Sequence, residues 1–258
     1  MPIAPLMATA AVVLRGFLAE RSLLAALALV LSSFGAGVLL GEVSLGQGGR
    51  FASNIAWVVA EVAGSSLALV HGAGLVGRRG VLGAFGLARP VSAGLLLGGR
   101  FLGLAAGLFV YAALVSVTLS GWLAFAHGGA AAAVLGIGWL LWLRVLVILA
   151  VSTLFLALVR PAVAIGLAAL FSLAGWLAAG FPAAGTSYLQ PVTWLATLVL
   201  PDLPALDVPI AGLPGSFSGA GPMLAGPTLY AILYAAAMVA AAIAVFPWRA
   251  RHPATPVS

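Results

Sequence analysis

Two charged side chains, Glu61 and Arg144, stand inside long apolar stretches of this 258-residue chain. An ionised group inside a membrane span is costly and usually faces the protein interior beside a partner. Glu61 lies sixteen residues before Gly77 and Arg144 lies sixteen residues before Arg160. At 1.5 Å of rise per helical residue, each lies about 24 Å from the same membrane boundary, nearer the outer leaflet. We therefore expect a Glu61–Arg144 salt bridge that locks the bundle, with a substrate contact as a second role. The alternative is that each side chain reaches the outer headgroups separately.

Other residue types that carry chemistry are scarce. The chain has no cysteine, which excludes disulfides, thiol catalysis and cysteine-ligated metals. His71, His127 and His252 are far apart in sequence and make a poor metal site. Glu61 is the one acid of five within an apolar stretch, so the paired carboxylates of an intramembrane hydrolase are missing. No Gly-rich phosphate loop ends in Gly-Lys-Ser/Thr. We expect no catalytic residue, cofactor or metal in this chain, and no enzyme activity of its own.

The composition is that of an integral membrane protein. Hydrophobic residues make up 64% of the chain and charged residues 6%, whereas about a quarter of the residues in a soluble domain are charged. A spanning helix needs about 20 apolar residues, and closed helices leave no backbone group unpaired in lipid. The sequence predicts an all-α protein with six spans, at residues 22–40, 55–76, 93–119, 133–159, 162–181 and 228–246.

The positions of the arginines predict the orientation. All eleven basic residues are arginines, and in a six-span arrangement nine of them fall on one side. The exceptions are Arg50, in an opposite loop, and Arg144. Cytoplasmic loops carry the excess of positive charge, so we expect both termini in the cytoplasm. Arginines at span ends contact membrane lipids, and we read no nucleic-acid partner from them. The N-terminal stretch has no basic residue before its apolar run, so no cleaved signal peptide is expected.

We treat residues 1–258 as one membrane domain. Two segments of it lie outside the predicted spans and differ from them in composition. Residues 1–21 predict a short amphipathic helix in the membrane interface, and the alternative is a simple extension of the first span. Residues 182–227 are rich in Pro and Gly and form the largest non-cytoplasmic segment, periplasmic or re-entrant. Trp194, Asp202 and Asp207 lie there and are candidates for contact with a periplasmic partner protein. The two aspartates read equally well as helix-capping and turn residues.

The loop between the second and third spans carries the most specific motif. Residues 87–103, LARPVSAGLLLGGRFLG, are similar to the Leu-X-Arg-Pro-Val-Ser motif and the following Gly-Lys/Arg-X-X-Gly helix start of ABC-2 type transporter permeases. Residues 55–79, 151–175 and 229–248 resemble other spans of that family in their apolar pattern. Within the family, the chain is most similar to the group associated with multicopper enzyme maturation, which includes the nitrous-oxide reductase maturation permease. The family usually has a Glu after the second span, where this chain has Gly-Arg-Arg-Gly at residues 77–80.

This resemblance implies a bacterial inner-membrane permease that pairs with a second permease copy, as homodimer or heterodimer, and binds two copies of a separate ABC ATPase subunit. It implies that residues 77–93 form a cytoplasmic coupling loop that transmits ATPase closure to export or to a periplasmic conformational change. The coupling residues would be Arg78, Arg79, Phe85, Arg89, Pro90 and Arg100.

Both the loop and the chain as a whole have an alternative interpretation. The loop also reads as an ordinary positive-inside loop, and Arg100 as a side chain that reaches the headgroups or pairs with the loop. The chain as a whole also reads as a non-transporting membrane anchor or assembly subunit of a larger respiratory or biogenesis complex. A neighbouring gene for an ATPase would favour the transporter over the anchor.

Overall fold

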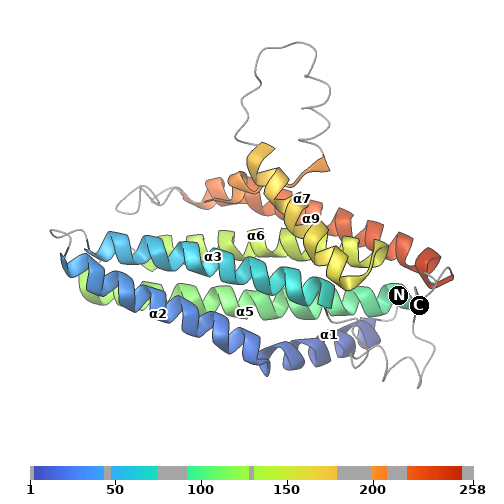
Figure 1. The fold of residues 1–258 in the computed structure, drawn as a ribbon, viewed down its shortest axis with the longest axis horizontal. Helices are drawn as coiled ribbons and strands as arrows, with labels where there is room; N and C mark the ends of the chain where they lie inside the picture. The colour runs from blue at the N-terminus through green and yellow to red at the C-terminus, as the bar shows by residue number, and fades with distance from the viewer. Residues whose placement is uncertain are drawn as a thin grey trace, which may run out of the picture.

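The computed structural model describes residues 3–43, 48–74, 92–127, 131–178, 199–207 and 220–251. These residues form helices and short connections, without a β-strand. The helices are α1 (Ile3–Leu18), α2 (Arg21–Val43), α3 (Gly48–Gly74), α5 (Ala93–His127), α6 (Ala131–Leu158), α7 (Pro161–Ala178), the short 3₁₀ helix η1 (Pro204–Leu206) and α9 (Ala220–Arg251) (Figure 1).

Six of these helices are long and apolar enough to cross a membrane, and they match the six predicted spans in order. The all-α, six-span fold class is therefore confirmed. The third and sixth spans are longer than predicted, because α5 has 35 residues and α9 has 32. The prediction starts the last span after Pro227, but α9 begins at Ala220 and continues through that proline. Spanning helices tolerate proline where neighbouring groups satisfy the freed backbone.

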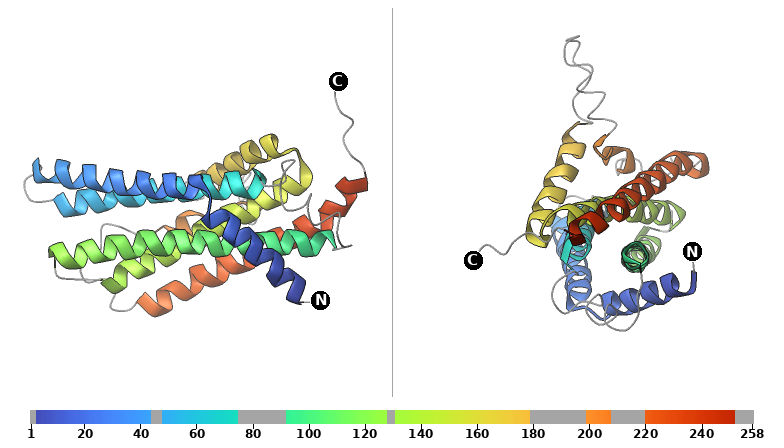
Figure 2. Two further views of the ribbon diagram at one scale, coloured as in Figure 1. Left: turned by 90° about the horizontal axis from the view of Figure 1, so that it is seen from below. Right: turned by 90° about the vertical axis from the view of Figure 1, so that its right-hand side faces the viewer.

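The helix α6 forms the centre of the bundle. It packs against α3, α5, α7 and α9, and it has the largest buried share of the six spans. The helix α2 lies along α3, and α1 packs obliquely across the first half of α5 (Figures 1 and 2). The start of α1 and the end of α9 lie at the same end of the bundle (Figure 1). Which side of a membrane this end faces stays a prediction.

The N-terminal helix is separate from the first span. After α1 ends at Leu18, Ala19 and Glu20 form a turn, in which the Glu20 amide donates to the Phe17 carbonyl at 3.1 Å. We call this turn with the start of α2 the elbow, residues 19–22. The helix α1 lies on a stripe of glycines on α5, at positions 99, 103 and 107. A Cβ at Gly103 would lie 2.5 Å from the Ala10 carbonyl oxygen. Small residues four apart allow helices in membranes to approach this closely.

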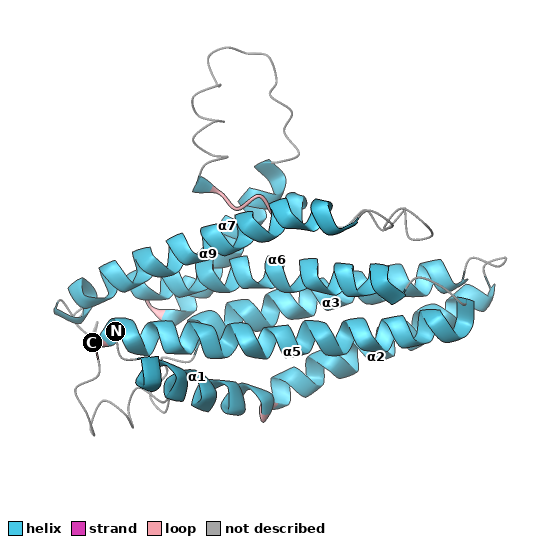
Figure 3. Ribbon diagram, turned by 180° about the vertical axis from the view of Figure 1, so that it is seen from behind, coloured by secondary structure: helices cyan, strands magenta, loops and turns pink. Residues whose placement is uncertain are grey.

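The described part of the connection between α7 and α9, residues 199–207, folds back onto the bundle beside both helices (Figure 3). We call it the outer segment. Leu203 and Leu206 are buried within the main hydrophobic core, and Pro201 lies against Gly175 of α7. The segment is therefore packed into the protein between three helices, which bears on the charged site below.

Candidate functional site

Arg144 and Glu61 meet inside the bundle. The Arg144 Nη1 atom lies 3.2 Å from Glu61 Oε1. The helices α3 and α6 run in the same direction, and their register is set by close contacts at small residues. A Cβ at Gly64 would lie 3.1 Å from Val145, and one at Gly72 would lie 2.6 Å from Ser152. This register gives the two charges matched depths, and the structure contains the salt bridge that the sequence predicts.

A second carboxylate completes the site, and the sequence did not indicate it. Arg144 Nη1 also donates to Asp207 Oδ1 at the end of the outer segment. We call Glu61, Arg144 and Asp207 the triad. From the sequence, Asp207 was predicted to contact a periplasmic partner or to lie in a turn. In the structure its carboxylate contacts Arg144 of the same chain. The two residues are 63 positions apart and one lies in a Pro-rich connection, so no local pattern could have linked them.

Hydrogen bonds to α9 hold the rest of the outer segment. The Asp202 amide donates to Tyr230 Oη at 2.7 Å, and Tyr234 Oη donates to the Val199 carbonyl at 2.8 Å. Asp202 Oδ1 accepts from the Ala205 amide at 3.2 Å at the start of η1. This bond gives Asp202 the turn role that the sequence left open as an alternative. The N-cap residue of η1 is Leu203, which makes no side-chain cap. The outer segment thus ties α6, α7 and α9 together.

The charges of the triad do not cancel. Two carboxylates share one guanidinium, so the ionised triad carries one excess negative charge. The exposed fraction is 13% for the Arg144 side chain, 34% for Glu61 and 37% for Asp207. The Arg144 Nε atom is buried and makes no hydrogen bond to any described residue. Within the described ranges, no three His, Asp or Glu side chains are grouped as a metal site. The arrangement can fix helices and a segment in place electrostatically.

A second polar cluster lies at the elbow. His71 Nε2 lies 3.0 Å from Ser22 Oγ and 3.3 Å from Glu20 Oε2, and its ring meets the edge of Phe17 at a centroid distance of 5.1 Å. From the sequence, His71 was weighed only as a metal ligand, and no contact was predicted for it. A histidine near the end of an apolar span is itself a signal for a buried polar contact.

Arg100 belongs to the same cluster, which argues against the alternative that it reaches the lipid headgroups. It is 7% exposed, and its Nη2 donates to the carbonyls of His71 at 2.7 Å and Gly72 at 3.2 Å. The last carbonyls of a helix lack intrahelical partners and carry partial negative charge, so they attract a cation. Arg100 therefore fastens the start of α5 to the end of α3. Its Nη1 is buried and makes no hydrogen bond within the part of the chain that the structure describes.

The remaining predicted coupling residues lie outside the described residues, as does Trp194. They are Arg78, Arg79, Phe85, Arg89 and Pro90. Most of residues 77–93 and of 182–227 also lie outside them, so these assignments stay predictions.

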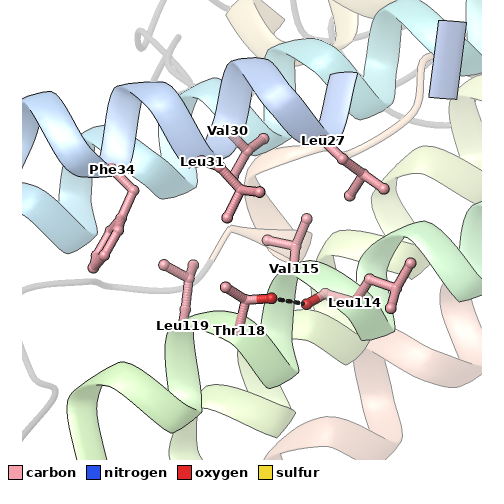
Figure 4. A pocket seen from close by; sticks show the side chains of 8 residues that line it. All are labelled: Leu27, Val30, Leu31, Phe34, Leu114, Val115, Thr118 and Leu119. Atoms are coloured by element: carbon pink, nitrogen blue, oxygen red, sulfur yellow. Dashed lines mark hydrogen bonds between the residues drawn. The ribbon is translucent and has the colours of Figure 1, made fainter. Parts of the chain in front are cut away.

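A cavity of about 140 Å³ lies between α2 and α5 (Figure 4). Apolar side chains line it, and its one hydroxyl, on Thr118, donates to the Leu114 carbonyl at 2.8 Å. Sites for drug-sized ligands measure about 300–1,000 Å³ and carry a few free polar groups. This cavity is too small and too apolar to select a polar solute. The lining residues are Leu27, Val30, Leu31, Phe34, Leu114, Val115, Thr118 and Leu119.

Comparison of the chain with protein-family models, with curated proteins and with solved structures found no match.

Proposed function

We propose that this chain is the permease subunit of an ABC-2 type transporter in a bacterial inner membrane. A separate ATPase subunit supplies the ATP hydrolysis, and a second permease copy completes the membrane part. The chain converts closure of the ATPase into export of a substrate or into a conformational change on the opposite side of the membrane. The resemblance of residues 87–103 motivates this function, and the six-span architecture is compatible with it.

The observation that best supports a coupling role is the elbow cluster. The connection between α3 and α5 contains the predicted coupling loop, and the helices at its two ends are fastened together by Arg100. His71, at the end of α3, also holds the elbow through Ser22 and Glu20. A force applied to this loop therefore reaches the end of α3, the start of α5 and the elbow together. An ordinary connecting loop needs no such buried polar cluster at its base.

The runner-up is a non-transporting membrane anchor or assembly subunit. The dense packing around α6 favours it, because the described part of the bundle shows a closed core with small residues at its helix contacts. Both functions agree with a membrane protein, and they differ in their partners.

The test is purification of the tagged full-length chain from its native membrane. We expect an ATPase subunit to copurify, and ATP to change the conformation of the particle. Replacing Arg79 or Arg89 by Glu should weaken ATPase association, since charge-assisted contacts are about twice as strong as neutral ones. Arg160→Glu is the matched control on an exposed arginine outside the loop. Membrane insertion should survive each change, because other arginines still set the orientation.

A particle without an ATPase, whose conformation ignores ATP, would overturn the transporter function. Copurification with redox or assembly subunits instead would establish the anchor. Normal ATPase association in both loop variants would remove the coupling role of these arginines.

A further inference from the structure

The carboxylates of Glu61 and Asp207 are about one third exposed although they lie deep in the bundle. Glu61 is seven residues inside the apolar window Asn54–Ala73 of α3, and ten residues before His71 of the elbow cluster. At 1.5 Å per residue, this places it about 15 Å from that cluster. The hydrocarbon core of a membrane is about 30 Å thick, so Glu61 lies within it, nearer the end where α3 begins.

Lipid chains are a poor environment for the exposed carboxylates of Glu61 and Asp207. Charged groups at the membrane centre are costly and almost always face the protein interior or water. The triad has one more carboxylate than it has cations, so the shared guanidinium does not neutralise the exposed oxygens. Arg144 itself is mostly covered, which leaves the two carboxylates as the accessible part of the site.

The backbone of the outer segment gives an independent reason why this side of the bundle does not face lipid. It hydrogen-bonds to Tyr230 and Tyr234, which are six and ten residues inside the apolar window Leu224–Phe246 of α9. Backbone that is not in a regular spanning helix is tolerated at such depth only where protein buries it or water reaches it. Asp202 and Ala205 of this segment are exposed. The other described residues of the chain leave both of them uncovered.

We propose that the face carrying Glu61, Asp202, Ala205 and Asp207 is in contact with water that enters from the end of the bundle where α3 and α9 begin. This gives aqueous solutes access to the interior of the membrane span, and the excess negative charge favours cationic solutes over anionic ones. The proposal does not depend on an ATPase partner, and it applies equally to a permease and to an anchor.

The absence of cysteine from the sequence permits a direct test by single-cysteine labelling of the full-length chain in sealed vesicles. Ser65→Cys places a thiol one helical turn beyond Glu61 on the same face of α3. Ala205→Cys places one on the exposed part of η1. Val62→Cys is the control, because Val62 adjoins Glu61 at the same depth and is 61% exposed on an apolar face. The probes are a cationic and an anionic methanethiosulfonate reagent, both membrane-impermeant, applied to vesicles of each orientation.

We expect the thiols at 65 and 205 to react at least an order of magnitude faster than the thiol at 62, from one side of the membrane only. The cationic reagent should react faster than the anionic one, and Glu61→Gln in the Ala205→Cys background should reduce this ratio several-fold. Labelling at 65 as slow as at 62 would overturn the proposal, since lipid or a second copy would then cover this face. Labelling at 205 alone would also overturn it, because the outer segment would then lie at the membrane surface.

Discussion

Both carboxylates of the triad contact the same nitrogen of Arg144, so replacing Arg144 should cost more free energy of unfolding than replacing either acid. Double-mutant cycles can measure this difference. Arg144 is the one cation between two carboxylates, so Arg144→Gln leaves two negative charges facing each other inside the bundle. Breaking a buried pair by removing one partner costs about 3–5 kcal/mol. Glu61→Gln leaves Arg144 paired with Asp207, and Asp207→Asn leaves it paired with Glu61. Each of these changes should cost about 1 kcal/mol, the usual net contribution of one hydrogen bond.

The coupling between Glu61 and Arg144 can be bounded from the geometry. Two unit charges about 4 Å apart interact by about 4 kcal/mol at an effective dielectric constant of 20. The Glu61 side chain is 34% exposed, and solvent screening reduces the interaction. We therefore expect a coupling energy of about 1–2 kcal/mol, so that Glu61→Gln and Arg144→Gln together cost clearly less than their sum. The pair Asp207→Asn and Arg144→Gln should behave in the same way.

The assay is the free energy of unfolding of the full-length chain, measured by titrating dodecyl sulfate into mixed micelles and following tryptophan fluorescence. Arg160→Gln is the matched control, because Arg160 is an exposed arginine at the turn between α6 and α7. An exposed substitution usually changes stability by less than about 0.5 kcal/mol. Strict additivity in both cycles, or a cost for Arg144→Gln no larger than for Arg160→Gln, would refute the reasoning.

Two further predictions concern the elbow end of the bundle. Gly107→Leu should detach α1 from α5, because a side chain at Gly107 would meet the Phe17 ring, and faster amide exchange in α1 would report this. The control Gly121→Leu has open space around it and should leave α1 protected. Arg100→Gln removes two charge-assisted hydrogen bonds to α3 and should lower the free energy of unfolding by about 1.5–3 kcal/mol. Arg21→Gln, at an exposed arginine, should cost much less, and equal costs would contradict the capping role of Arg100.

The spans and the matched depth of Glu61 and Arg144 were predictable because lipid leaves few choices. A run of about 20 apolar residues in hydrocarbon must be helical, so residue number translates directly into depth. Two opposite charges at equal depth in such helices have few other partners. The separate helix before the first span was also predictable, because Arg15, Glu20 and Arg21 interrupt the apolar pattern there.

The contacts that depend on distant packing were not predictable. Asp207 meets Arg144 only because the outer segment folds back between α6, α7 and α9, and a Pro-rich sequence does not specify that path. Arg100 was expected to be a coupling residue, with a reach to the headgroups or a pairing with the loop as the alternative. Its actual partners are carbonyls at the end of α3, and only the assembled bundle brings them near. The glycines at 99, 103 and 107 were visible in the sequence, but which helix would lie on them was not.

The helix α3 connects the two polar sites. It carries Glu61 of the triad and His71 of the elbow cluster, ten residues apart, and it contains no proline between Gly48 and Gly74. A helix of this kind moves as one body, so any sliding of α3 against α6 breaks the salt bridge to Arg144 while it displaces the elbow. Gly72 against Ser152 and Gly64 against Val145 resist the same movement. We therefore expect α3 and α6 to stay together when force reaches the elbow, and any conformational change to occur where packing is looser. The apolar gap between α2 and α5 is such a place, since their contacts are few and a cavity separates them.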